Sequence, residues 1–168
     1  MNDTASLKFE DKEIELPVFR GTEGEVALDI SKLRAQTGLI TLDKGYKNTG
    51  ATTSAITFLN GEEGILHYRG YSIEDLAENA SFMEVAYLLV YGDLPDQERL
   101  DWFQDSVRMH TLVHENMKRF FEAFPMGAHP MGMLSAMSST LSTFYPGSQD
   151  PNRSVEDIEL TIHRLIAK

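Results

Sequence analysis

The sequence contains no cysteine among its 168 residues. Disulfide bridges, thiolate catalysis and cysteine-ligated zinc or iron–sulfur sites are therefore excluded. Basic residues are also few, since 15 Lys and Arg stand against 26 Asp and Glu and leave a formal net charge of −11. Because such a chain repels a polyanion at long range, the composition excludes a nucleic-acid-binding role.

Long apolar runs are absent as well. No stretch reaches the ~18 to 20 residues that a helix needs to cross a bilayer, and the N-terminus is too polar for a secretory signal. We therefore expect a soluble, cytoplasmic protein without a membrane partner. Hydrophobic residues make up 42% of the chain and charged residues 24%, which is typical of a globular domain and excludes wholesale disorder.

The first part of the chain has the pattern of strands and turns. Apolar and charged residues alternate over residues 7–10 and 14–16, which predicts a β-hairpin. A second hairpin is predicted for residues 56–59 and 65–68, where Asn60-Gly61 is expected to supply the positive φ of the turn. One short helix near residues 30–36 separates the two. We assign residues 1–70 to this N-terminal β-hairpin and loop region.

From Ser72 onward the apolar residues recur with a helical period, so residues 71–168 are predicted to be helical. Ser81 and Glu84 form a capping box, and Gly92 is expected to end that helix. A long amphipathic helix is predicted for residues 96–124, and a nearly uncharged, buried helix for residues 131–144. The predicted fold class is mainly α with a small β-hairpin N-terminal region.

The last predicted helix begins after Ser154 and keeps its apolar face almost to Lys168. No Gly, Asn or Pro follows its last turn. We therefore expect that the sequence is apparently truncated inside this helix and that the native chain continues past Lys168.

The histidines are the first candidates for chemistry. His110 and His114 are four residues apart, with Glu115 beside them, but two histidines without a third ligand are a weak metal pattern. We therefore expect no metal site. His129, before Pro130, is expected to cap a helix. The methionines near it are expected to fill gaps in the core; they are residues 126, 131, 133 and 137.

No dinucleotide-binding glycine motif, Walker loop or G-x-S-x-G nucleophile motif is present. The residues alone thus indicate only an α-rich domain with a small β N-terminus. Several sequence segments indicate more than this fold class: Arg20–Gly24, Ala55–Gly61, Gly64–Ala77, Tyr91–Pro95 and His129–Met131. Together they resemble citrate synthase over nearly the whole chain. The N-terminal hairpin region is similar to that of the bacterial hexameric, type II-like enzyme.

The resemblance implies an almost wholly helical fold and an acyltransferase of the tricarboxylic acid cycle. That enzyme condenses acetyl-CoA with oxaloacetate to citrate and CoA, using an aspartate base and two histidines. In the family these three residues lie beyond the part that this chain matches. We therefore expect no catalytic residue here, and no activity from 168 residues alone. No cofactor is implied, because acetyl-CoA is a substrate.

The resemblance also implies a homo-oligomer, from dimer to hexamer, to which this segment would contribute scaffold and subunit contacts. Two alternatives stay open at this point. The chain could be a non-catalytic oligomerisation or nucleotide-sensing module of citrate synthase ancestry. It could also be a segment of a 2-methylcitrate synthase.

Hexameric members are often inhibited by NADH, and the matching positions here are His110, Thr111, Tyr145, Arg164 and Lys168. We take these five residues as a candidate effector site, with NADH as an allosteric ligand. Met109 stands where NADH-sensitive relatives carry an arginine, and Arg108 lies about 100° away around the helix, so weak inhibition is expected. In the alternative interpretation, Arg164 and Lys168 only complement the dipole of the last helix.

Overall fold

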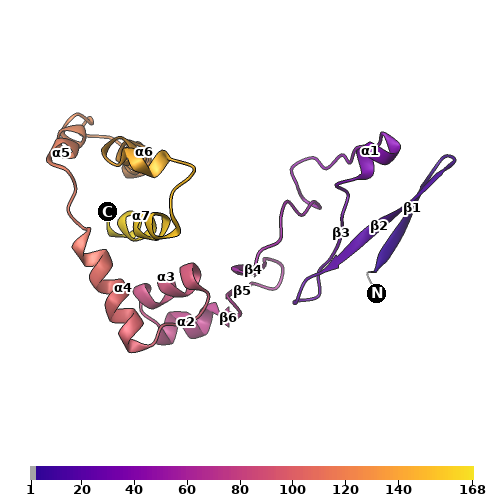
Figure 1. Ribbon diagram of the computed structural model, residues 1–168, viewed down its shortest axis with the longest axis horizontal. Helices are drawn as coiled ribbons and strands as arrows, with labels where there is room; N and C mark the ends of the chain where they lie inside the picture. The colour runs from indigo at the N-terminus through magenta and orange to yellow at the C-terminus, as the bar shows by residue number, and fades with distance from the viewer. Residues whose placement is uncertain (1–2) are drawn as a thin grey trace. The chain divides into compact units, whose positions relative to one another are not determined.

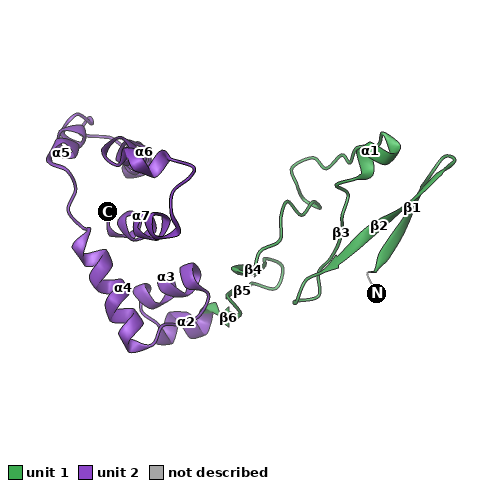
Figure 2. Ribbon diagram, viewed as in Figure 1, with its two compact units in different colours: residues 1–73 green, residues 74–168 purple. Residues whose placement is uncertain are grey.

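The computed structural model describes residues 3–168 (Figure 1). The chain divides into two compact units, one ending at Ile73 and the other running from Glu74 to Lys168 (Figure 2). The first unit is built from strands and loops around one short helix. The second is built from helices. Each unit has its own hydrogen bonds and packing and is described by itself.

The first unit begins with the predicted hairpin. Strands β1 (Thr4–Phe9) and β2 (Lys12–Arg20) pair in antiparallel fashion. A third strand, β3 (Val26–Leu28), pairs with β2 and was not predicted, because three residues are too few to show an alternating pattern. The short helix α1 (Leu33–Thr37) follows, and it ends at a left-handed Gly38.

The second predicted hairpin is also confirmed, by strands β4 (Thr57–Asn60) and β5 (Ile65–Tyr68), and β6 (Tyr71–Ser72) extends it. The expected positive φ at Asn60-Gly61 is wrong. The positive φ lies at Gly64 instead, at 72°. The reason is loop length: the connection between paired strands has four residues rather than two, and such loops are built differently from a two-residue Asn-Gly turn.

The second unit contains six α-helices and one short 3₁₀ helix among its described residues. They are α2 (Ile73–Asn79), α3 (Phe82–Tyr91), α4 (Gln97–Met109), α5 (Glu115–Glu122), α6 (Pro130–Phe144), η1 (Pro146–Gln149) and α7 (Val155–Ala167). The predicted helix boundaries are confirmed where capping residues marked them. Ser81 and Glu84 form the capping box of α3, Gly92 ends that helix in the left-handed region, and the Ser154 hydroxyl accepts from the amide of Asp157.

The single long helix predicted for residues 96–124 is wrong, because α4 ends at Met109 and α5 begins at Glu115. Local side-chain bonds compete with the helical ladder at the break. The Nδ1 of His110 lies 2.7 Å from the carbonyl oxygen of Ser106, and the Thr111 hydroxyl donates to the Arg108 carbonyl. His110 and His114 are therefore a C-cap and an N-cap on different helices, not neighbours on one face.

Helix α6 was predicted to be buried, and this is wrong for most of its length. Met137 is buried, whereas Met131 and Leu134 are exposed by 62% and 57%. The expectation that the methionines fill the core is likewise wrong for Met126 and Met131, which are both exposed. The physical reason is a shortage of partners: within the described residues, α6 packs mainly against the short elements α5 and η1.

The core of the second unit lies where α4 packs against α3 and α7. Phe103 of α4 is fully buried among Tyr87, Val107 and the end of α7. Its ring meets the ring of Tyr87 edge-on, with centroids 5.6 Å apart. One polar residue, His163, is buried in the same region. These contacts hold α7 in place and so position the surface that α7 presents on its other side.

Truncating Phe103 should therefore destabilise this unit strongly. We expect Phe103→Ala to lower the free energy of unfolding by about 3–5 kcal/mol, because the substitution leaves a cavity that the surrounding rings cannot fill. Phe120→Ala is the matched control, since Phe120 is 48% exposed and should cost about 1–2 kcal/mol. Urea unfolding of both variants measures the difference, and equal losses would contradict the placement of the core.

Candidate functional site

A pocket of about 250 Å³ opens in the second unit where α6, η1 and α7 meet. Serine and threonine hydroxyls, two guanidinium groups, one ammonium group and an aromatic ring line it. The lining residues are Ser138, Leu141, Ser142, Tyr145, Ser148, Arg153, Thr161, Arg164, Leu165 and Lys168. We call this the α6–α7 pocket.

Tyr145 lies at the centre of the cationic part of this pocket, directly after α6. The guanidinium carbon of Arg164 lies 5.2 Å from the centroid of the Tyr145 ring, and the Nζ of Lys168 lies 5.6 Å from it. Arg164 lies in the last turn of α7 and Lys168 is the C-cap of that helix, four residues later, so the two side chains lie on the same side of its C-terminal end. The ring attracts both cations through its quadrupole and thus holds two positive charges close together.

Among residues 3–168, the two cations have no carboxylate partner. Of the salt bridges between residues that the structure describes, none includes Arg164 or Lys168. Both side chains are partly buried, so solvent screens their mutual repulsion only in part. In a protein with a net charge of −11, this unneutralised pair favours the binding of an anion.

Lys168 also ties α7 to the loop between α4 and α5. Its Nζ donates to the carbonyl oxygen of His110, 2.8 Å away, and to the carbonyl oxygen of Leu112. These two bonds use two of the three ammonium protons and leave the positive charge in place. The third proton remains for a ligand.

Arg153 supplies a third positive charge. Its Nη1 lies 3.5 Å from the hydroxyl oxygen of Thr161, and its Nε donates to the carbonyl of Asp150. The sequence did not single out Arg153 or the pocket serines. Serine and threonine recur along α6, but such residues are common on exposed helix surfaces, and only the packing of α7 shows which of them line a pocket.

The structure brings together three of the five candidate effector residues, namely Tyr145, Arg164 and Lys168. His110 and Thr111 lie in the loop after α4 and do not line the α6–α7 pocket, although the His110 carbonyl accepts a bond from Lys168. Met109 ends α4 and is 77% exposed.

Arg108, the guanidinium group nearest to Met109 in sequence, is occupied elsewhere. Its Nη2 lies 2.7 Å from the Asp105 carboxylate on the same helix. This i,i+3 pair is exposed and therefore weak. Arg108 does not line the α6–α7 pocket.

Two further histidines, His114 and His129, have local partners. The Nδ1 of His114 accepts a hydrogen bond from the backbone amide of Asn116 and so caps α5. The Nδ1 of His129 accepts one from the amide of Met131 and caps α6. The predicted capping role of His129 is thereby confirmed. Across residues 3–168, no three His, Asp or Glu side chains are grouped so that they could hold a metal ion. Helices long and apolar enough to cross a membrane are likewise not found over this range.

Comparison with known proteins places these residues in a family context. A family model described as "Citrate synthase, C-terminal domain" matches residues 45–168. Citrate synthase 1 of Mycobacterium tuberculosis is 45% identical over 167 residues, and citrate synthase of Corynebacterium glutamicum is 44% identical over the same length. Each alignment covers 99% of this chain and 38% of the relative. The chain thus spans 38% of the length of these curated relatives.

Two solved structures share the fold. Citrate synthase of the archaeon Thermoplasma acidophilum, solved as a ternary complex with carboxymethyl coenzyme A and oxaloacetate, gives a TM-score of 0.65 at 23% identity and covers 76% of this chain and 33% of its own. Citrate synthase of Pyrobaculum aerophilum gives a TM-score of 0.64 at 24% identity and covers 90% and 35%. These likenesses confirm the predicted fold class.

The bonds from Lys168 to the loop predict a measurable tether. We expect Lys168→Met to speed amide hydrogen exchange over residues 110–113 and to lower stability by about 1–3 kcal/mol, because two charge-assisted bonds are lost. Lys118→Met is the matched control, since its Nζ pairs only with the exposed Glu115 carboxylate and should change stability by about 0.5 kcal/mol or less. Unchanged exchange in Lys168→Met would contradict the tether.

Proposed function

The chain belongs to the citrate synthase family, and from this premise we propose that it serves the condensation of acetyl-CoA with oxaloacetate to citrate and CoA. Identity of 45% over 99% of the chain supports this proposal. The Thermoplasma acidophilum relative was solved with a coenzyme A derivative and oxaloacetate bound, which are the ligand classes that we propose for the complete enzyme.

Residues 1–168 contribute scaffold, subunit contacts and an effector site in this proposal, and the catalytic base lies in the part of the family that they do not match. Exposed apolar side chains on α6, such as Met131 and Leu134, support a role in contacts with further helices or with a second subunit. We propose a homo-oligomer for that reason.

The effector site of this proposal is the α6–α7 pocket, and its ligand is NADH. The observation that carries the assignment is the pair of cations, Arg164 and Lys168, placed over Tyr145 with no salt bridge to a carboxylate of the described residues. A pyrophosphate group between them would accept charge-assisted hydrogen bonds from both side chains, and Arg164 can bond two oxygens at once. The hydroxyls of Ser138, Ser142 and Thr161 would face the sugar or the second phosphate.

The alternative in which the two cations only complement the helix dipole explains less of the geometry. Lys168 gives its hydrogen bonds to carbonyls outside α7. Arg164 lies against a ring that follows another helix. Both side chains therefore serve the junction of α7 with its neighbours, which is where the pocket opens.

NADH binding tests this function through fluorescence titration of the chain at neutral pH. Arg164→Gln should weaken binding by about 1.5–3 kcal/mol, because one charge-assisted contact to phosphate is lost. Arg119→Gln, an arginine of α5 away from the pocket lining, is the matched control. Equal affinity of Arg164→Gln and the control would contradict the assignment of the pocket.

Residues 1–168 alone should show no citrate synthase activity. Enolising a thioester methyl group needs a positioned base and a hydrogen-bond donor to the developing enolate, and the family places both in the part that these residues do not match. CoA release from acetyl-CoA and oxaloacetate measures this directly. Turnover by the isolated 168-residue polypeptide would contradict the proposal that the catalytic base lies outside these residues.

A further inference from the structure

His163 is buried in the core of the second unit and has no role in the function proposed above. It lies on α7 and is 2% exposed. Its Nε2 lies 2.7 Å from the Tyr91 hydroxyl of α3, and its Nδ1 lies 2.7 Å from the Ser106 hydroxyl of α4. One imidazole thus joins three helices, and it is the residue that directly precedes Arg164.

The hydrogen-bond pattern assigns the protons of this network. The Tyr91 hydroxyl donates its only proton to the Glu159 carboxylate, 2.7 Å away, so its oxygen must accept the bond from His163. Nε2 of His163 therefore carries the proton, and Nδ1 accepts from the Ser106 hydroxyl. The neutral ring satisfies every partner in this chain of bonds.

The surroundings favour this neutral ring. Burial lowers the pKa of His163 and outweighs the nearby Glu159 carboxylate, which raises it, while His110 adds to the lowering. Burial also raises the pKa of Tyr91 far above its ordinary value, with Glu159 contributing. The titratable and charged groups that face this network are Glu159 of α7, Tyr87 and Tyr91 of α3, Arg99 of α4 and His110 at the end of α4.

Helix α7 has two faces with different tasks. Glu159, His163 and Ile166 recur at helical spacing and face the core. Thr161, Arg164, Leu165 and Lys168 line the α6–α7 pocket. Because successive residues are about 100° apart around a helix, any rotation of α7 about its axis that breaks the bonds of His163 also moves both pocket cations.

We propose that His163 is a positioning residue of the α6–α7 pocket, whose neutral ring fixes the rotation of α7 and thereby holds Arg164 and Lys168 over Tyr145. That the pocket binds a ligand rests on the function proposed above. The link from His163 through α7 to Tyr145 rests on the structure alone. Protonation turns Nδ1 into a donor that faces a hydroxyl already donating to it, so the network must rearrange.

The sign of the pH dependence follows from the lowered pKa. At pH values above the ordinary histidine value of 6.5, the ring is neutral and the pocket is fully formed. As pH falls below this value and through the lowered pKa of folded His163, the ring takes a proton, α7 loosens and anion binding weakens. Reciprocally, a bound anion makes protonation of His163 harder.

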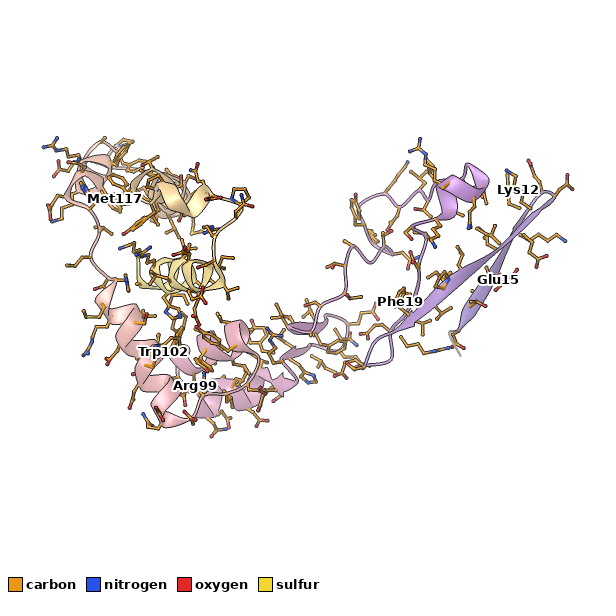
Figure 3. The ribbon with its side chains drawn as sticks, in the orientation of Figure 1. Lys12, Glu15, Phe19, Arg99, Trp102 and Met117 are labelled. Carbon is orange, nitrogen blue, oxygen red and sulfur yellow. The ribbon has the colours of Figure 1, made fainter. Side chains whose placement is uncertain are left out.

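The chain carries its own probe for this titration. Trp102 is the single tryptophan, and its ring lies 5.3 Å from the His163 ring, centroid to centroid. Figure 3 shows its position on α4. Because a protonated imidazole quenches a neighbouring indole, Trp102 emission should fall as the pH is lowered below the ordinary histidine value of 6.5 and through the lowered pKa of His163. His163→Gln should abolish this change, and His129→Asn, which removes another histidine and keeps a good helix cap, should retain it.

Two measurements then test the coupling in the full 168-residue chain. The probe is ADP-ribose, whose pyrophosphate stays ionised over this range. Its affinity should fall as the pH is lowered from 7.5 through the Trp102 midpoint, by up to about tenfold, and saturating ADP-ribose should lower that midpoint by about one pH unit, because a tenfold change in affinity corresponds to one pKa unit. In His163→Gln the affinity should not depend on pH. The NMR resonance of the Tyr145 ring should change with pH at the same midpoint as the Trp102 emission, both with and without ADP-ribose.

The outcomes separate this inference from the function on which it rests. A Tyr145 resonance that follows Trp102 while ADP-ribose fails to bind at any pH supports the positioning role and refutes the effector site. A Trp102 titration that leaves both the Tyr145 resonance and the ADP-ribose affinity unchanged overturns the positioning role. If His163→Gln does not fold, the wild-type protein decides: where ADP-ribose binds, an unshifted Trp102 midpoint overturns the inference, and where it does not bind, a Tyr145 resonance that fails to follow Trp102 overturns it.

Discussion

The packing of α7 against α3 and α4 is the constraint on which the second unit depends. It is made by aromatic rings around Phe103 and by one buried imidazole whose two nitrogens bond to different helices. A buried polar group contributes specificity only when all its partners are satisfied, and the neutral His163 ring meets that condition. Helix α7 therefore has a defined rotation, which an apolar interface alone would fix less strictly.

The candidate site follows from that rotation. Arg164 and Lys168 are useful for binding an anion because α7 turns them toward Tyr145, and Lys168 in turn holds the loop at His110. One side of α7 thus packs against the core, and the other side lines the cationic pocket. In the function proposed above, the pocket senses an anionic nucleotide through this helix.

Much of the fold could be predicted from the sequence, because local signals mark it. Alternation predicted the first hairpin, the Asn60-Gly61 pair between two apolar runs predicted the second, and caps such as Ser81 and Gly92 marked helix ends. The break at His110 was not predicted, because no Gly or Pro marks it and the local bonds of His110 and Thr111 to α4 carbonyls become visible only in the structure. The exposure of Met131 also depends on packing partners and not on the apolar pattern.

The candidate site was predictable only in part and for a different reason. Resemblance to the family pointed to Tyr145, Arg164 and Lys168, which the structure gathers at one pocket, but periodicity could not show that Arg153 lines it as well. His163 carried no signal at all, because a histidine on the apolar face of a helix is usually a satisfied core residue. Its two partners become visible only when three helices are packed together.

A crystal structure of the chain with ADP-ribose bound tests the central claim most directly. The account predicts that the pyrophosphate lies within hydrogen-bond distance of the Arg164 guanidinium and the Lys168 ammonium groups, above the Tyr145 ring, with His163 still bonded to Ser106 and Tyr91. A ligand bound away from Tyr145, or one bound there while α7 has rotated and the bonds of His163 are broken, would contradict it.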